Sequence, residues 1–270
     1  MVARSLFFSG RPKSILAALA LAALAAVSSG AALAQQQAIY APGEPIVTGF
    51  SGVAPPGSPP PTGDPLDRTF IDLDGASMVI QQLRPDGPPA GQVIDAPTVF
   101  SAKARDIGQV FGVTLDDAPV PNIYVSATSA YGLDIVVPGS DGEPIRSRVG
   151  ATNATFMPGQ WGTAGGAQGG PGSIWKIDGS TGAISLFATI PGYSGAGLGD
   201  IVFDPITEQF FVSDLDNGLI YRSGLDGQVI DSFDHGVTAR PAHGLAAVAD
   251  DGSEIDITNR SFNSENPAAR

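Results

Sequence analysis

The feature that most constrains this chain is an internal repeat of apolar strands separated by glycine and aspartate turns. Residues 112–126 read Gly-Val-Thr-Leu-Asp, a short gap, and Asn-Ile-Tyr-Val-Ser. Residues 199–213 repeat this pattern as Gly-Asp-Ile-Val-Phe-Asp, a short gap, and Gln-Phe-Phe-Val-Ser. A second matched pair follows at 173–178 and 219–223, and a third copy opens at Gly244. The last two copies start about 45 residues apart, which is the length of one four-stranded β-propeller blade.

The clearest copy predicts four strands, at 198–203, 209–214, 218–223 and 229–234, joined by turns rich in Asp, Gly and Pro. The preceding copy has the same four strands but carries a Gly-rich insertion at 136–172. We expect this insertion to be a flexible loop that can be removed without loss of folding. After the N-terminal segment no stretch shows a sustained helical period, so the predicted fold class is all-β.

The first 34 residues have the pattern of a bacterial-type signal peptide. Arg4, Arg11 and Lys13 precede an apolar run at 15–27, and Ala-Leu-Ala ending at Ala34 offers small residues for cleavage. The alternative is a membrane anchor, which the shortness of the run disfavours. We therefore expect cleavage after Ala34 and an exported protein, periplasmic or extracellular, with no membrane span after signal removal.

Composition excludes several kinds of chemistry. The chain has no cysteine, which rules out thiolate metal sites and thiol nucleophiles. Its formal net charge is −13, and all the acidic residues follow the predicted signal peptide. Such a surface repels nucleic acid and anionic lipid, so we expect neither as a partner.

The mature chain is predicted to begin with a Pro- and Gly-rich linker at 35–67, followed by a partial propeller at 68–270. An apolar island in the linker, residues 45–50, either docks as a strand on the folded body or belongs to a flexible lead-in. A hairpin is expected at 69–83, where an Asp-Gly pair supplies the turn. Its spacing matches the third and fourth strands of a blade.

The C-terminal copy, residues 244–258, has the spacing of the first and second strands of a blade. The chain therefore encodes about two complete blades plus partial blades, which is too few to close a ring. Either it is a truncated member of a longer family, which we favour, or it forms an open arc that pairs with another chain. Open blade edges would then promote self-association.

Aspartate and aromatic residues have mainly structural roles in this pattern. Six Asp-Gly pairs recur along the chain, and we expect most of them to be turns in which the carboxylate bonds local backbone. Trp175, Tyr221, Phe203 and Phe211 alternate as expected for residues packed between blades.

Three segments carry a resemblance to a known superfamily: Gly-Leu-Gly-Asp-Ile-Val-Phe-Asp-Pro at 197–205, Phe-Val-Ser-Asp at 211–214 and Gly-Leu-Ile-Tyr-Arg at 218–222. Over roughly 105–260 the chain resembles the NHL and senescence-marker/gluconolactonase-type six-bladed propellers. That resemblance implies a propeller fold. Members include sugar-lactone hydrolases with one divalent metal near the central channel, and binding platforms with no chemistry.

If the chain followed the metal-bearing members, the resemblance would place ligands for a divalent cation such as calcium at Asp200 and Asp214, with His243 as a further candidate. Gly108 and Gln109 stand where the preceding blade should offer a ligand, so the oxygen site is incomplete. With only two histidines in the chain, a multi-His metal site is excluded.

Two functions remain open from the sequence. The first is a binding or scaffold module for an unknown protein or small-molecule ligand. The alternative is a metal-dependent lactone or ester hydrolase of the gluconolactonase type, in degenerate form. No residue of this chain is assigned a catalytic role.

Overall fold

A computed structural model describes residues 38–55, 57, 59–82, 96–148, 150–192, 195 and 197–234. Two compact units divide the chain, 1–37 and 38–270, and every described residue belongs to the second. The predicted signal peptide with its cleavage site at Ala34, the candidate His243 and the C-terminal copy of the repeat therefore lie outside the described residues.

Within the described ranges the chain is almost entirely strand. Helical structure is confined to α2 (Ala104–Ile107) and two 3-10 turns, η1 (Pro65–Arg68) and η2 (Ala164–Gly166). The strands are β1 (Ile46–Thr48), β2 (Ala76–Gln81), β3 (Thr98–Lys103), β4 (Val110–Leu115), β5 (Ile123–Ala127), β6 (Ile135–Pro138), β7 (Pro144–Arg146), β8 (Thr155–Phe156), β9 (Ser173–Ile177), β10 (Ile184–Thr189), β11 (Leu198–Asp204), β12 (Gln209–Asp214), β13 (Leu219–Gly224) and β14 (Val229–Asp234).

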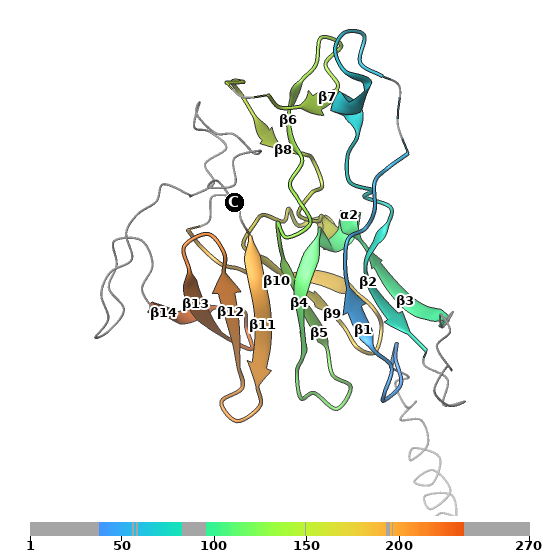
Figure 1. Ribbon diagram of the computed structural model, residues 1–270. Coiled ribbons are helices and arrows are strands. Elements are labelled where there is room, and N and C mark those ends of the chain that lie inside the picture. Colours follow the sequence, from blue (N-terminus) through green and yellow to red (C-terminus); the bar gives the residue numbers. More distant parts are fainter. Residues whose placement is uncertain are drawn as a thin grey trace, which may run out of the picture. The chain divides into compact units, whose positions relative to one another are not determined.

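These strands form four antiparallel sheets. The first sheet has the order β1-β2-β3, the second β4-β5-β9-β10 and the third β11-β12-β13-β14, while β7-β6-β8 make a small sheet. Figure 1 shows the first three in succession, from β1–β3 through β4, β5, β9 and β10 to β11–β14. The prediction of an all-β chain with four-stranded antiparallel sheets is confirmed, and all four strands predicted for the third sheet are present.

The three larger sheets pack face against face through apolar side chains. One cluster lies between the first and second sheets and contains Met78, Ile80, Ala102, Ile107, Val110, Ile123, Val125, Ala164, Trp175 and Ile177. Another lies between the second and third sheets and contains Tyr124, Ile174, Ala188, Ile190, Leu198, Ile201, Phe203, Phe210, Val212 and Tyr221. Burial of these side chains is the main stabilising contribution to the stack.

A hydroxyl-to-carbonyl hydrogen bond joins the first sheet to the second, and another joins the second sheet to the third. The Thr48 hydroxyl of the first sheet donates to the Phe111 carbonyl of the second at 2.6 Å. The Ser126 hydroxyl of the second sheet donates to the Gly199 carbonyl of the third at 2.6 Å, and it accepts from the Gly112 N–H at 3.1 Å. Both carbonyls belong to β-bulges in the first strand of their sheet, which turn backbone groups away from the ladder.

One predicted core residue is displaced by a single position. Trp175, Tyr221 and Phe203 are buried as expected, but Phe211 is only half-buried and Phe210 is the fully buried ring. Because side chains alternate along a strand, burying Phe210 places its neighbour on the opposite face. Phe210 lies 4.4 Å from the Tyr124 ring, measured between ring centroids, so the aromatic core crosses the sheet boundary.

The hairpin predicted at 69–83 does not form. Ile71 makes only an isolated bridge with Val53, and β2 pairs instead with β1 and β3. The Asp74 carboxylate is held by an ion pair with Lys103 at 3.2 Å, so this Asp-Gly pair anchors the end of β3 instead of closing a hairpin. The apolar island of the N-terminal segment does contribute a strand, β1.

The prediction of a flexible loop at 136–172 is wrong for its described residues. Its first half forms the small sheet, and its second half packs into the core. Ala164 belongs to the cluster between the first two sheets, and the Trp175 indole N–H donates to the Trp161 carbonyl at 3.1 Å. A side chain at Gly169 would overlap that carbonyl. In contrast to the sequence-based expectation, removal of 137–171 should therefore unfold the protein.

Replacing Ser126 by Ala should lower the free energy of unfolding by about 1–3 kcal/mol, because the buried Gly112 N–H and Gly199 carbonyl lose their partner. Chemical denaturation would measure this change. The control is Ser185→Ala, an exposed serine on β10, which should stay within about 0.5 kcal/mol of the unsubstituted protein. Equal effects of both substitutions would contradict a stabilising role for the Ser126 hydrogen bonds between the second and third sheets.

Replacing Gly169 by Ala tests the tight packing of the insertion. The new Cβ would collide with the Trp161 carbonyl and lie 2.9 Å from the Trp175 ring, so we expect a loss of about 1–3 kcal/mol. Gly49→Ala is the matched control, since its Cβ would meet no atom within 4 Å. Thermal unfolding of both variants measures the difference, and a Gly169→Ala protein as stable as the control would restore the loop interpretation.

Candidate functional site

Asp200, the first predicted metal ligand, lies in the bulge of β11 with an exposed side chain. Its Oδ1 accepts a hydrogen bond from the N–H of the next residue, Ile201, at 2.9 Å. Its own N–H donates to the Ser213 hydroxyl at 3.0 Å. This backbone arrangement repeats that of Gly112 and Ser126 in the second sheet, so the surroundings of Asp200 are those of a structural bulge.

Asp214, the second predicted ligand, ends β12 on the face that is buried against the second sheet. Its Oδ1 accepts from the Asp216 N–H at 2.8 Å, while its Oδ2 is buried with no hydrogen bond. Burial raises the pKa of Asp214, the negative charge of Asp216 adds to this rise, and hydrogen bonds from Asp216 and Asn217 offset it only in part. Asp214 is therefore a buried carboxyl whose charged form is disfavoured.

The described residues supply only part of a metal-binding set. Asp200 is exposed and Asp214 is buried, and no group of three His, Asp or Glu side chains that could hold a metal ion occurs in the described ranges. Calcium takes six to eight oxygen ligands, more than these two carboxylates provide. Since His243 lies beyond Asp234, the metal site stays a prediction.

Gln109, noted for standing where a ligand was expected, is a structural link. It is fully buried, its Oε1 accepts from the Ser51 N–H at 3.2 Å and its Nε2 donates to the Ser51 hydroxyl at 2.6 Å. Its carbonyl accepts from the Thr128 N–H at 2.9 Å. The side chain ties the N-terminal segment to the start of β4.

The aspartates of the described Asp-Gly pairs bond nearby backbone, with one exception. Asp178 accepts from the Thr181 N–H at 2.8 Å, Asp226 from the Gln228 N–H and Asp141 from the Glu143 N–H. These three are turn residues, as predicted. Asp74 is the exception, because its carboxylate bonds the Lys103 and Arg105 side chains instead of turn backbone, and the other two pairs lie outside the described residues.

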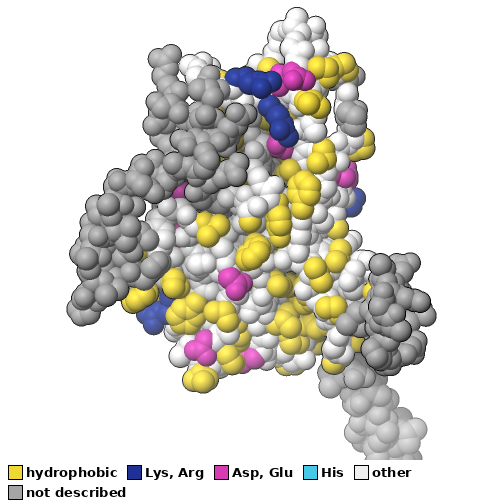
Figure 2. Space-filling model, viewed as in Figure 1, with side chains coloured by type: hydrophobic (Ala, Val, Ile, Leu, Met, Phe, Trp, Pro, Cys, Tyr) yellow, Lys and Arg dark blue, Asp and Glu magenta, His cyan; other side chains and the backbone are white. Residues whose placement is uncertain are grey.

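Charged side chains gather where the small sheet lies. Figure 2 shows basic groups beside acidic ones at that end of the protein. The ion pairs there are Arg68–Asp141 at 2.5 Å, Arg148–Asp67 and Arg146–Asp134 at 3.4 Å. Each basic group thus faces a carboxylate, and this region presents no net basic patch for an anionic ligand.

Asp134 is the buried member of this group. Its Oδ2 accepts from the Ile71 N–H at 2.7 Å, and the Gln160 side chain bonds its backbone N–H at 2.9 Å. Burial raises the pKa of Asp134, against the effect of the Ile71 hydrogen bond and the Arg146 charge. Its contacts join the small sheet to the segment before β2, which is a structural role.

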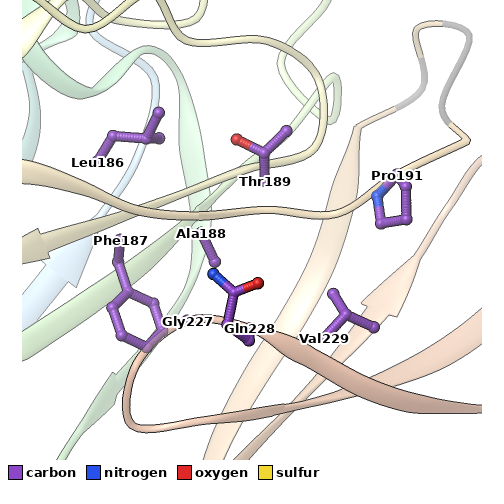
Figure 3. A pocket seen from close by; sticks show the side chains of 8 residues that line it. All are labelled: Leu186, Phe187, Ala188, Thr189, Pro191, Gly227, Gln228 and Val229. Carbon is purple, nitrogen blue, oxygen red and sulfur yellow. The ribbon is translucent and has the colours of Figure 1, made fainter.

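An open cleft of about 470 Å³ between the second and third sheets is a candidate binding site. One wall is β10 with the residues after it, and the other is the turn before β14 with the start of that strand. The lining residues are Leu186, Phe187, Ala188, Thr189, Pro191, Gly227, Gln228 and Val229. In Figure 3 the Gln228 carboxamide lies beside Ala188, and Pro191 faces Val229 across the cleft.

Local backbone geometry shapes this cleft. β10 carries a bulge between Leu186 and Ala188, and Gly227 has φ +77°, which favours glycine. Gly227 also approaches the Phe187 carbonyl so closely that any side chain there would collide with it. Sequence reasoning missed this site because its two walls come from different copies of the repeat, and neither copy carries a motif for it.

No protein-family model, curated protein or solved structure matches the chain. In addition, none of the helices among the described residues is long and apolar enough to cross a membrane.

Replacing Asp214 by Asn tests whether this carboxyl is buried or metal-bound. Because its folded pKa is raised, ionisation costs stability as the pH rises above the ordinary Asp value. We expect the two proteins to unfold at similar temperatures near pH 3, and Asp214→Asn to unfold at a higher temperature at pH 7. Each kcal/mol gained is worth about 2–4 °C.

Thermal unfolding at both pH values, with calcium and with a chelator, provides the measurement. Asp231→Asn, an exposed position on β14, is the control. A variant that is less stable than the unsubstituted protein only when calcium is present would contradict burial as the dominant effect and would favour a metal site.

Proposed function

We propose that this chain is an exported binding or scaffold module in which the three larger sheets are blades of a partial β-propeller. The proposal rests on the successive antiparallel sheets, stacked face to face and joined by repeated hydroxyl-to-carbonyl bonds. The resemblance of residues 197–222 to NHL and gluconolactonase-type propellers points the same way. Export, to the periplasm or outside the cell, rests on the signal-like first 34 residues.

The observation that carries the binding role is the cleft between β10 and β14. Its volume of about 470 Å³ is in the range of ligand pockets. Apolar side chains such as Leu186 and Val229 line it, while Thr189 and Gln228 supply a hydroxyl and a carboxamide. We propose that it takes an uncharged or weakly polar group of a small molecule or protein, held by apolar contacts and one or two hydrogen bonds.

Charge narrows the class of partner. With a net charge of −13, the chain repels nucleic acids and anionic membranes, so neither is proposed as a ligand. None of the eight residues that line the cleft is charged. A neutral ligand would meet no unpaired charge there.

A metal-dependent lactone or ester hydrolase is the second candidate function. One observation favours it, namely the Asp214 Oδ2, which is buried without a hydrogen-bond partner and could serve a cation. Elemental analysis of the purified protein and a panel of sugar lactones would test this candidate. A tightly held divalent ion, lost together with turnover in an Asp200→Ala, Asp214→Ala double variant, would displace the binding module as the proposed function.

Filling the cleft should abolish ligand binding. We expect Thr189→Trp, on the exposed side of β10, to weaken binding of any neutral fragment found by NMR screening by about tenfold or more, since each 1.4 kcal/mol lost is a factor of ten. Fragments should shift the amide signals of Thr189, Gln228 and Val229. The matched control is Ser185→Trp, on the same strand outside the cleft.

The outcome that contradicts this assignment is equal binding by both Trp variants, or fragment-induced shifts confined to other residues. The absence of any binding among neutral fragments would count against the binding role itself.

A further inference from the structure

The third sheet presents a face whose counterparts in the first and second sheets are covered. Strand pairing aligns one row of residues across each sheet, and each row begins with a hydroxyl, on β1 in the first sheet, β5 in the second and β12 in the third. The rows are Thr48–Met78–Ala102 in the first sheet, Ser126–Ile174–Ala188 in the second and Ser213–Ile220–Phe233 in the third.

In the first two sheets this row is an interface. Met78 and Ile174 are fully buried, and the hydroxyls of Thr48 and Ser126 each donate to a bulge carbonyl of the next sheet. The following sheet provides apolar side chains that complete the core. The row therefore marks the face through which one sheet receives the next.

In the third sheet the same row is open. Phe233 is 60% exposed and Val202, on the same face, is 55% exposed. Within the described ranges the Ser213 hydroxyl bonds only the bulge of its own sheet, accepting from the Asp200 N–H at 3.0 Å and donating to the Asp200 carbonyl at 3.4 Å. This face has the residue types of a sheet-to-sheet interface, but no described residue of another sheet places a bulge carbonyl where the Ser213 hydroxyl could donate to it.

We propose that residues 244–258 of this same chain dock on the open face of the third sheet. The segment repeats the residues by which the third sheet packs on the second, at a constant spacing of about 45 residues. Gly244 corresponds to Gly199. Apolar residues fall at four aligned core positions, Ala246 for Ile201, Val248 for Phe203, Ile255 for Phe210 and Ile257 for Val212, while Leu198 aligns with His243 just before the segment.

The connection supports this occupant over a second molecule. The chain between the end of β14 and Gly244 has the same length as the chain between the end of β10 and Gly199. A connection of that length already carries the backbone from the outer strand of the second sheet to the first strand of the third. By the same correspondence, docking would bring the Gly244 carbonyl to the Ser213 hydroxyl, as Gly199 meets Ser126.

One residue sets the spacing of this docked segment. A Cβ on Gly112 would lie 2.8 Å from the Asp200 Cα, so glycine permits close contact between the second and third sheets. Asp200 occupies the position of Gly112 in the third sheet and carries a side chain. For the segment to dock as proposed, its backbone would have to stand farther from Asp200 than Asp200 stands from Gly112, and a disulfide between positions 200 and 245 tests whether the two come within disulfide reach.

The absence of natural cysteines makes disulfide trapping a clean test. Leu245 corresponds to Asp200, so Asp200→Cys combined with Leu245→Cys in the full chain should form an intramolecular disulfide under mild oxidation. The matched control combines Asp200→Cys with Ser253→Cys, which corresponds to the far turn at Glu208. Peptide mapping by mass spectrometry should find at least about fivefold more cross-link in the first pair, because a disulfide requires nearby Cα atoms.

Hydrogen exchange on the unsubstituted chain gives a second readout that does not depend on how the variants fold. Docking predicts slow exchange of the amides at 246, 248, 255 and 257, and faster exchange there in Phe211→Asp, which places a charge on the open face. The effect should exceed that of Val47→Asp, a control on the exposed face of the first sheet.

Three results would overturn the proposal: equal cross-linking of the two cysteine pairs, unprotected amides throughout 244–258, or cross-links only between molecules. Intermolecular cross-links, with association that grows with concentration, would assign the face to a second copy. Ligand binding in the cleft between β10 and β14 is measured separately, so its failure leaves this docking test unaffected.

Discussion

Stacking of twisted sheets through one hydroxyl-to-carbonyl bond per junction is the constraint on which the rest of the structure depends. Apolar burial drives the sheets together but is not directional, so by itself it leaves their register open. Thr48 and Ser126 remove that freedom, because each must reach one bulge carbonyl of the next sheet. The bulge is therefore part of the joint between sheets, and the extra residue it inserts exposes a carbonyl that a regular strand would keep in its own ladder.

The same joint explains why the two candidate metal ligands differ so much in their surroundings. Asp200 is the bulge residue of β11, which turns it to solvent, whereas Asp214 continues the buried alternation of Phe210 and Val212. The sequence pattern of the repeat contains both aspartates, but in the fold Asp200 lies in the bulge at the sheet interface and Asp214 lies in the core. For a buried carboxyl such as Asp214, protonation relieves the cost of burial without any ligand, which is the behaviour its raised pKa indicates.

Sequence reasoning succeeded where information is local and failed where it is not. The strands of the third sheet were predictable because alternation, Asp-Gly turns and spacing all agree there. Phe210 and Phe211 were exchanged because two adjacent aromatic residues satisfy the same alternation in either phase. The hairpin at 69–83 failed because β2 finds partners in β1 and β3, which are distant in the sequence, and its Asp-Gly pair is held by Lys103. The core role of the insertion depends on Trp161 meeting Trp175, which no spacing rule reveals.

The cleft could not be predicted either, because it depends on the orientation of the Phe187 ring, which the sequence does not reveal. Corresponding turns of the second and third sheets place Gly182 and Gly227 in the same left-handed conformation, at φ +73° and +77°. Gly182 meets the Phe100 ring of the first sheet, so an aromatic side chain occupies the space beside that turn. A side chain at Gly227 would meet the Phe187 carbonyl and the Ala188 Cβ, while the Phe187 ring turns inward and packs edge-on against Tyr124 at 4.8 Å between ring centroids. The inward ring strengthens the core between the second and third sheets and leaves the outer part of the same junction open to a ligand.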